Sequence, residues 1–388
     1  MAMLAFERSE YLERLGKTKQ RMAAAGIDVL LVSNEHNMNY LSGYDGYSSY
    51  VPQFLMVAGD VDEPLWVGRE MDVGCALNSV FIDHAGIVGY PERYIGDPDL
   101  HPMGFMADLL RERGWANRRL GVELDTEPFS PYAYSQLQRH LPNAQFVDAG
   151  PLVNWVRGVK SPQELIYMRQ AGVISDLAMQ TAIDSIAVRV RQCDAAAAVT
   201  AALIRGTDEF GGDVPSKPTM ATGPRSSGPH LTWTEERYKP GEATNIELGG
   251  CRHRYHCGLS RTVVVGQPDA KLTELAPIVT EGMGVALDAA RPGATCEEVE
   301  AAFRRFTMER GALKPSRIGY AIGNGWTEGT ASLKPGDKTV LEPNMTFHMM
   351  LGFWYTDWGY VCSEVFRVAD SGAPETFSSL PRQLFVNA

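Results

Sequence analysis

The sequence predicts an N-terminal α/β domain followed by an α+β domain, and three observations support this division. Helical periodicity and short apolar strands alternate over roughly the first 150 residues, as is typical of α/β domains. A helix start then follows at Ser161-Pro162, with a capping glutamate at Glu164. Beyond it, a hairpin over residues 244–262 and two later strands make the chain richer in β-structure. We therefore expect domains 1–158 and 159–388.

The individual elements follow from local periodicity. Amphipathic runs bounded by capping residues or glycine predict helices, and short apolar runs predict strands. In the first domain we expect helices at 8–25, 104–113 and 129–141 and strands at 28–33, 120–123 and 144–148. In the second we expect helices at 162–187, 194–204, 271–290 and 296–310, strands at 346–353 and 360–368, and loops at 210–213 and 224–233.

The stretch 244–262, TNIELGGCRHRYHCGLSRT, contains the feature that most invites a chemical interpretation. Its apolar pattern breaks at Gly249-Gly250 and resumes after a charged tip, so we expect a hairpin around a glycine-containing turn. Glu247 lies in the first strand, where an unpaired buried charge would be costly. It is therefore either a structural carboxylate, capping the hairpin or paired with Arg261, or an acid kept for chemistry.

Composition narrows the classes of partner. The formal net charge of −11 disfavours nucleic acid and anionic membranes, and no apolar run approaches the roughly 20 residues of a membrane span. The first residues, MAMLAFERSEYLERL, lack a hydrophobic signal core, and the six cysteines form no CxxC pair. We therefore expect a cytoplasmic protein with free thiols that binds neither nucleic acid nor a membrane.

From Lys160 onward, several strings resemble the creatinase and aminopeptidase P family, whose catalytic domain has the pita-bread fold. The resemblance implies a creatinase-like α/β domain before a pita-bread catalytic domain, and the family's usual homodimer. The strings are Lys160-Ser161-Pro162 with Met168-Arg169, Ser260-Arg261-Thr262, Arg317-Ile318-Gly319-Tyr320-Ala321-Ile322-Gly323 and Leu341-Glu342-Pro343-Asn344-Met345.

Peptidases of that family hold two metal ions with two Asp, one His and two Glu. The resemblance places at those positions Glu247, Gly258, Tyr320, Met350 and Ser363. Glycine and methionine lack the oxygen or nitrogen ligands that hard cations need. We therefore expect no metal and no cofactor. His253 and His256 do not replace them, because their odd separation on a strand would send the two side chains to opposite faces.

Within the family, the sequence is similar to the ectoine hydrolases. The shared strings are Gly43-Tyr44-Asp45-Gly46, Phe210-Gly211-Gly212-Asp213, Pro229-His230-Leu231-Thr232-Trp233, Arg254-Tyr255-His256-Cys257 and Thr346-Phe347-His348-Met349. The sequence departs from that pattern at Gly258, at Val361 and in a shorter loop over 323–332; the last two are candidates for the pocket wall. The resemblance implies metal-independent opening of a small cyclic amidine, ectoine or 5-hydroxyectoine, to an N-acetyl-diaminobutyrate.

Three other functions stay open. A creatinase-like amidinohydrolase fits Gly228-Pro229-His230, but creatinase's hairpin glutamate falls at Leu259 or Ser260, and neither binds a guanidinium. A non-catalytic pita-bread domain would bind peptides or proteins and show no turnover. A metallopeptidase would contain stoichiometric metal.

The hydrolase hypothesis assigns roles to particular side chains. Glu247 is the nucleophile or the base that activates water, and His230 shuttles the proton, because imidazole titrates near neutral pH. Each assigned residue also has a structural alternative, such as core packing, a backbone hydrogen bond or, for Glu364, an ion pair with Arg367. The predicted catalytic residues are Glu247, His230, His348 and Glu364, and the predicted substrate-binding residues are Tyr50, Trp233, Tyr255, Tyr320 and Trp358.

Overall fold

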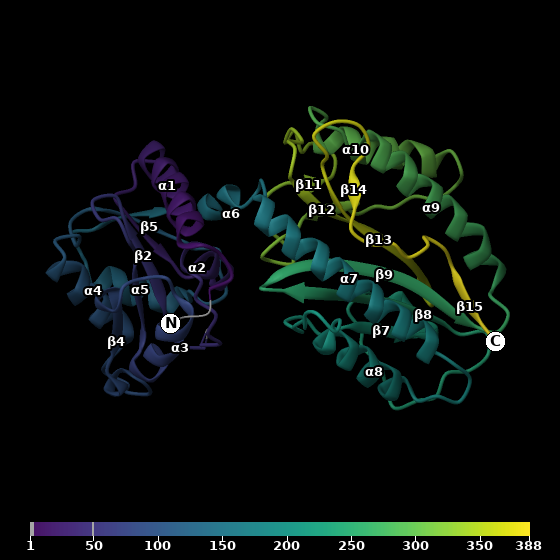
Figure 1. Ribbon diagram of the computed structural model, residues 1–388, viewed down its shortest axis with the longest axis horizontal. Coiled ribbons are helices and arrows are strands. Elements are labelled where there is room, and N and C mark those ends of the chain that lie inside the picture. The colour runs from purple at the N-terminus through teal and green to yellow at the C-terminus, as the bar shows by residue number, and fades with distance from the viewer. Residues whose placement is uncertain (1–3, 49) are drawn as a thin grey trace. The chain divides into compact units, whose positions relative to one another are not determined.

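The computed structural model describes residues 4–48 and 50–388 and divides into two compact units, Met1–Arg157 and Gly158–Ala388 (Figure 1). The division falls one residue before the boundary expected from the sequence. Residues 1–3 of the N-terminal stretch and Ser49 of the tyrosine-rich loop before Tyr50 lie outside the described residues.

The N-terminal unit is built on a six-stranded mixed sheet in the order β4-β3-β2-β1-β5-β6. Strand β2 is antiparallel to both neighbours, whereas β3–β4, β1–β5 and β5–β6 are parallel. Helices supply the connections between the parallel strands, as in other α/β units. The strands are β1 (Val29–Val32), β2 (Phe54–Ala58), β3 (Leu65–Arg69), β4 (Ile87–Tyr90), β5 (Arg119–Val122) and β6 (Gln145–Asp148).

The helices of this unit confirm the expected periodic segments, each to within two residues. Helices α2 and α3 and strands β2 to β4 were not expected from the sequence. The helices are α1 (Arg8–Ala24), α2 (Glu35–Ser42), α3 (Val73–Ser79), α4 (Pro102–Glu112), α5 (Pro131–His140) and α6 (Leu152–Val156).

The C-terminal unit contains two sheets, a four-stranded one in the order β15-β9-β8-β7 and a five-stranded one in the order β11-β10-β12-β13-β14. All neighbours are antiparallel except β15 and β9. Its strands are β7 (Thr219–Thr222), β8 (Ala243–Arg252), β9 (Tyr255–Val265), β10 (Gly319–Ala321), β11 (Ser332–Leu333), β12 (Thr346–Trp354), β13 (Gly359–Arg367), β14 (Glu375–Thr376) and β15 (Phe385–Asn387).

Four helices complete this unit: α7 (Pro162–Ser185), α8 (Gln192–Arg205), α9 (Ala270–Ala289) and α10 (Cys296–Met308). The expected capping box is present, since the Ser161 hydroxyl accepts from the Glu164 amide and the Glu164 carboxylate accepts from the Ser161 amide. Helices α7 and α8 share one apolar core with alternate residues of the β8–β9 hairpin (Figure 1). Because side chains alternate along a strand, the intervening residues face away from those helices.

The hairpin differs from its expected form in one respect. Strand β8 runs through Gly249-Gly250 to Arg252, and the turn consists of His253 and Arg254, whose φ angles are 49° and 67°. Two left-handed residues make the tight turn that suits hairpins. The glycines serve packing instead. A β-carbon on Gly249 would lie 2.3 Å from the Trp326 ring, and one on Gly250 would lie 2.2 Å from the Ala171 carbonyl oxygen.

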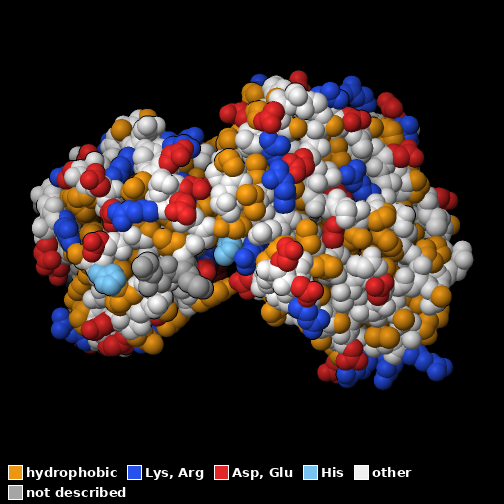
Figure 2. All heavy atoms as spheres, viewed as in Figure 1, with side chains coloured by type: hydrophobic (Ala, Val, Ile, Leu, Met, Phe, Trp, Pro, Cys, Tyr) orange, Lys and Arg blue, Asp and Glu red, His pale blue; other side chains and the backbone are white. Residues whose placement is uncertain are grey.

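In Figure 2, Lys and Arg side chains are interspersed with Asp and Glu on the face in view of each unit. None of the helices in residues 4–48 and 50–388 combines the length and apolar character needed to cross a bilayer.

Candidate functional site

A cavity of about 360 Å³ in the C-terminal unit brings Glu247 of β8 and Tyr320 of β10 to one wall. A small recess beside it adds Met350 and Val361. Residues from both sheets therefore contribute. The lining residues of the main cavity are Ser216, Lys217, Thr219, His230, Glu247, Leu248, Gly249, Arg317, Tyr320, Trp326 and Thr327.

Glu247 is the only carboxylate among these lining residues. In the sheet, Glu247 lies opposite Ser260 of β9 and opposite Thr219 of β7. Burial raises the pKa of Glu247 to about 7, and the Ser260 hydroxyl offsets part of that rise. An acid that is half ionised near neutral pH and opens on a cavity suits base or nucleophile chemistry. The alternative partner Arg261 pairs with Glu364 instead.

Tyr320 joins the cavity wall to a buried row of polar groups. The Trp326 indole Nε1 donates to the Tyr320 hydroxyl at 3.0 Å, and that hydroxyl lies 3.2 Å from His348 Nδ1. His348 Nε2 in turn lies 2.9 Å from the Ser363 hydroxyl. Burial and the nearby Glu247 raise the pKa of Tyr320 to about 12, and burial lowers the pKa of His348 to about 3. Tyr320 is therefore held protonated and His348 neutral.

His348 is fully buried and contacts the cavity wall through Tyr320 and Trp326. The sequence predicted it to be catalytic. Its place in the row makes it a positioning residue, because both of its ring nitrogens are engaged by Tyr320 and Ser363. Rings packed edge to face on either side, Tyr320 and Trp326, fix its orientation further.

The His348 ring also fills the place where a metal ligand would stand. Gly258, opposite Gly249 in the hairpin, lies directly beneath it, and a β-carbon there would be 2.7 Å from His348 Cε1. Gly258 cannot accept an aspartate unless His348 moves. The remaining ligand positions hold Met350 and Ser363, which are cross-strand partners. Among residues 4–48 and 50–388, no three His, Cys, Asp or Glu side chains converge as a metal site. The donor set does not fit a two-metal centre.

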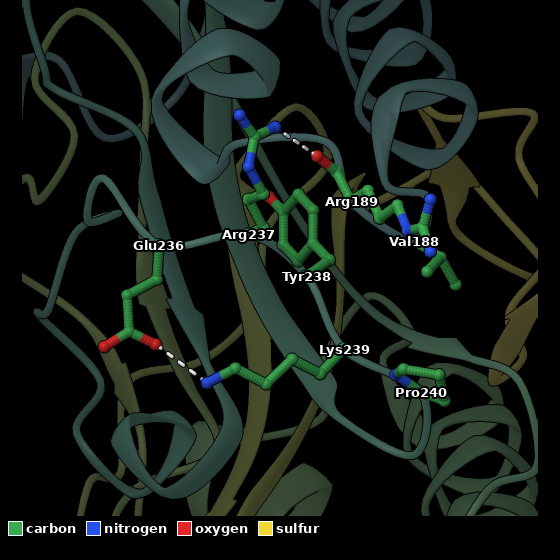
Figure 3. A pocket seen from close by; sticks show the side chains of 7 residues that line it. All are labelled: Val188, Arg189, Glu236, Arg237, Tyr238, Lys239 and Pro240. Atoms are coloured by element: carbon green, nitrogen blue, oxygen red, sulfur yellow. Dashed lines mark hydrogen bonds and ion pairs between the residues drawn. The ribbon is translucent and has the colours of Figure 1, made fainter.

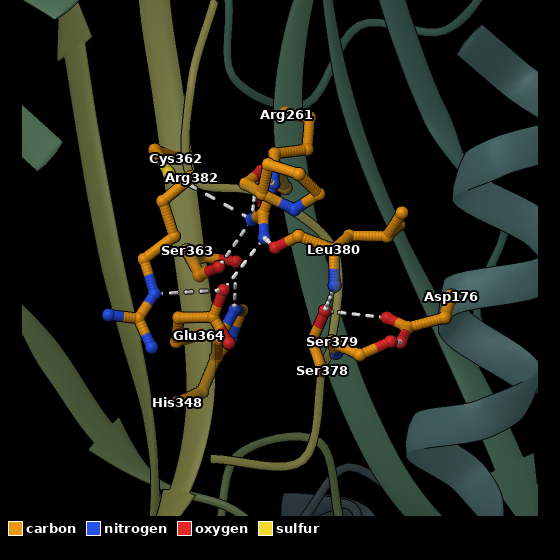
Figure 4. Close-up of polar contacts among 12 residues, drawn as sticks. Asp176, Arg261, His348, Cys362, Ser363, Glu364, Ser378, Ser379, Leu380 and Arg382 are labelled. Atoms are coloured by element: carbon orange, nitrogen blue, oxygen red, sulfur yellow. Dashed lines mark hydrogen bonds and ion pairs between the residues drawn. The ribbon is translucent and has the colours of Figure 1, made fainter.

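Glu364, predicted to be catalytic, is not among the residues that line the cavity. It neighbours Ser363 on β13, so it points to the opposite face of the strand. Its Oε1 accepts from Arg261 Nη2 at 2.7 Å, and both side chains are buried. Arg261 also donates to the carbonyls of Ser363, Leu380 and Pro381, which ties the C-terminal segment to β9 (Figure 4). Glu364 is structural, with Arg261 rather than Arg367 as its partner.

Tyr255 and Trp358 are also absent from the cavity wall, contrary to the prediction. Tyr255 is fully buried, and its hydroxyl donates to Glu164 at 2.8 Å, which supports the start of α7. The Trp358 ring stacks on Tyr355 with centroids 4.3 Å apart. Both are accounted for by packing.

Trp233 reaches the site indirectly. Its ring lies 4.5 Å from the Lys217 ammonium, and Lys217 lines the cavity. Trp233 therefore supports a cation on the wall, where the sequence predicted direct contact with a cationic ligand. His230 is exposed and lines the cavity with Glu247, so the structure brings these two predicted residues together.

Tyr50 belongs to the N-terminal unit, where Arg69 Nη1 donates to its hydroxyl at 3.0 Å. Its role in substrate binding stays a prediction, as do the homodimer and the cytoplasmic location.

Sequence reasoning missed Lys217, Arg317 and Trp326. It did anticipate that the loop over 323–332 and Val361 would line the pocket, and the structure places Trp326, Thr327 and Val361 there. The signal for the two cations was their position, since each comes two residues before a short strand at the site, β7 or β10.

A second, larger cavity of about 520 Å³ lies elsewhere on this unit (Figure 3). Among the groups that line it, Lys239 pairs with Glu236 at 3.0 Å, and the Arg237 side chain donates to the Arg189 backbone carbonyl. No predicted site residue lines it. The predicted residues Glu247, His230 and Tyr320 lie instead on the cavity described above.

Comparison with known proteins agrees with the fold. The chain belongs to metallopeptidase family M24, whose model matches residues 166–370, and residues 14–159 match the creatinase/prolidase N-terminal domain. It is a hydrolase with a creatinase-like N-terminal domain and a pita-bread catalytic domain.

Individual relatives cover nearly the whole chain. It is 40% identical over 398 residues to ectoine hydrolase of Halomonas elongata, covering 99% of this chain and 98% of the relative. It is 42% identical over 391 residues to an uncharacterized hydrolase/peptidase of Sinorhizobium fredii, covering all of both chains. A prolidase from Thermococcus sibiricus has the same fold, with a TM-score of 0.84 at 20% identity and coverage of 97% and 99%.

Proposed function

We propose that this chain is a metal-independent hydrolase that opens a small cyclic amidine, ectoine or 5-hydroxyectoine, to an N-acetyl-diaminobutyrate. The observation that carries the proposal is the single acid, Glu247, with a pKa of about 7 in a cavity whose metal-ligand positions hold Gly258 and Met350. The 40% identity to ectoine hydrolase over the full chain supports the choice of substrate.

Glu247 acts on the amidine carbon. It either attacks that carbon directly or removes a proton from the water that attacks it. If Glu247 attacks, a C–O bond to its carboxylate forms, and water later displaces the carboxylate from the same carbon, which breaks that bond and restores the acid. If Glu247 acts as a base, water forms the C–O bond directly. In both routes the ring C–N bond breaks, its electron pair stays on the nitrogen, which takes up a proton, and water supplies the oxygen of the new amide. An ionised Glu247 also pairs with the amidinium, which places the reacting carbon near the carboxylate.

The groups around Glu247 supply the rest of the chemistry. His230 lies on the same cavity and is free to exchange protons with solvent, which suits it to protonate the leaving nitrogen. The Tyr320 hydroxyl, held by Trp326 and His348, presents a fixed hydrogen-bonding group beside the reacting carbon.

The pH dependence follows from Glu247. If its ionised form is active, kcat/KM should rise about tenfold per pH unit up to about pH 7 and then level off. Tyr320 and His348, with pKa values of about 12 and about 3, do not change charge in this range. Initial rates from pH 5 to 9 measure the profile. A His230→Gln variant should keep the same midpoint, and a midpoint that moves with His230 would assign the titration to the histidine.

Metal removal should leave activity unchanged. The enzyme, dialysed against a chelator and checked by elemental analysis, should contain less than stoichiometric divalent metal and retain its full rate, because its donor set does not fit a two-metal centre. Loss of activity on chelation, restored by zinc or manganese, would contradict metal independence.

A substrate panel tests the function itself. Ectoine, 5-hydroxyectoine, creatine and Xaa-Pro dipeptides are incubated with the enzyme, and products are identified by mass. Ring opening of ectoine or hydroxyectoine, with a gain of one water, is the expected result. Urea from creatine would favour the creatinase-like function instead, and free proline would favour a peptidase.

A further inference from the structure

Two cationic side chains, Lys217 and Arg317, line the cavity together with Glu247. They come from different sheets: Lys217 precedes β7, whose first residue Thr219 pairs with Glu247, and Arg317 precedes β10. Both side chains are exposed. The cavity therefore contains one carboxyl group and two cationic side chains. Neither an apolar nor a purely cationic ligand would match this pattern of charge.

Both cations are held in place without being neutralised. The Lys217 ammonium lies over the Trp233 ring at 4.5 Å. Arg317 Nη1 donates to the Ser332 hydroxyl at 3.1 Å, and its guanidinium lies 4.4 Å from the Tyr320 ring. A cation over an aromatic face keeps its N–H donors for another partner. Within residues 4–48 and 50–388, neither cation forms an ion pair with a carboxylate.

The cations do not neutralise the acid of the cavity either. Burial raises the pKa of Glu247, and only the Ser260 hydroxyl opposes the rise. The cavity wall therefore presents one acid and two cations that are not paired with each other.

We propose that Lys217 and Arg317 form the subsite for a carboxylate on the substrate, while Glu247 meets the C–N bond to be broken. The guanidinium offers a planar pair of N–H donors that fits a carboxylate, and the ammonium adds a point charge. The site thus selects small zwitterions over neutral or purely cationic amidines. This inference rests on the proposed function for the position of the reacting bond.

The test compares two ligands that differ only in the carboxylate: ectoine, and the same methylated tetrahydropyrimidine ring without its carboxylate. Binding is measured by calorimetry on the Glu247→Gln enzyme, which prevents turnover. Ectoine should bind about 10- to 100-fold more tightly, as expected for charge-assisted hydrogen bonds. Adding Lys217→Met or Arg317→Met should remove most of this preference, whereas Lys338→Met, at an exposed lysine outside the cavity, should leave it intact.

The same comparison in turnover separates a binding role from a structural one. With Glu247 intact, Lys217→Met and Arg317→Met should raise KM for ectoine by a similar factor and change KM for the ring lacking the carboxylate much less. Equal binding of the two ligands, absence of binding, or equal losses with both ligands would overturn the subsite. A carboxylate preference in an enzyme that opens neither ring would uphold the subsite and overturn the proposed hydrolysis.

Discussion

Replacing Glu247 by glutamine should lower kcat for ring opening by at least about 1,000-fold, because the side chain keeps its shape but loses the charge that attacks carbon or deprotonates water. No other carboxylate lines the cavity and could take over its role. Product formation from ectoine, followed by mass, measures the loss. Intact-protein mass during a single turnover of the native enzyme then distinguishes the two roles, because only a nucleophile forms a covalent adduct.

The stability of the same variant separates chemistry from structure. The folded-state pKa of Glu247, about 7, lies above the ordinary value of 4.5, so ionising this group costs stability as the pH rises through that interval. At pH 8 the native enzyme bears the cost and the glutamine variant does not. The melting temperature should therefore be unchanged or higher. A lower melting temperature together with full activity would make Glu247 a structural carboxylate.

Replacing Gly258 by aspartate should be the most damaging substitution after those at Glu247. A β-carbon there would lie 2.7 Å from the His348 ring, so the ring must leave Tyr320 and Ser363. Overpacking of this kind costs about 1–3 kcal/mol, and a buried carboxylate adds to it. We expect a lower melting temperature, at least about 100-fold lower activity because Tyr320 loses its support, and no gain of bound metal.

Two glycine variants serve as references for that result. Gly258→Ala carries the steric part without the charge and should show an intermediate loss. Gly284→Ala, in α9, adds a β-carbon with nothing within 4 Å and should be neutral or slightly stabilising. A Gly258→Asp enzyme that is stable, active and loaded with metal would show that His348 does not define this site.

The sequence predicted the architecture well because periodicity and capping are local signals. The start of α7 at Ser161-Pro162, the hairpin strands and the paired strands β12 and β13 were all confirmed. The missed strands β2 and β3 are apolar runs around the segment Gly59-Asp60, and their turn signal was present but overlooked.

The site was predicted less completely, because a strand residue lines the cavity only if its side chain lies on the face that borders the cavity. Glu247, His230 and Tyr320 were placed on the cavity as expected, and Trp326 lies in a loop already suspected. Neighbours on one strand point to opposite faces. Glu364 illustrates this: a shift of one residue from Ser363 turns a candidate ligand into the buried partner of Arg261.

The position of the hairpin turn was also predicted wrongly, because of Gly249 and Gly250. Read alone, two adjacent glycines indicate a turn. The contacts that require them come from Trp326 and Ala171, which lie far away in sequence. Long-range packing of this kind leaves no local signal, and the sequence pattern therefore placed the break in the wrong position.

The contact between Gly258 and His348 constrains how such a protein could change its chemistry over time. An acidic side chain at 258 is unfavourable while the imidazole is present, and removing the imidazole first leaves Tyr320 and Ser363 without their shared partner. Substitutions at two contacting positions are not additive. Evolution toward or away from metal use at this site would have to pass through a single variant that is less stable than either the starting or the final protein. The alternative is that both codons change within a short interval.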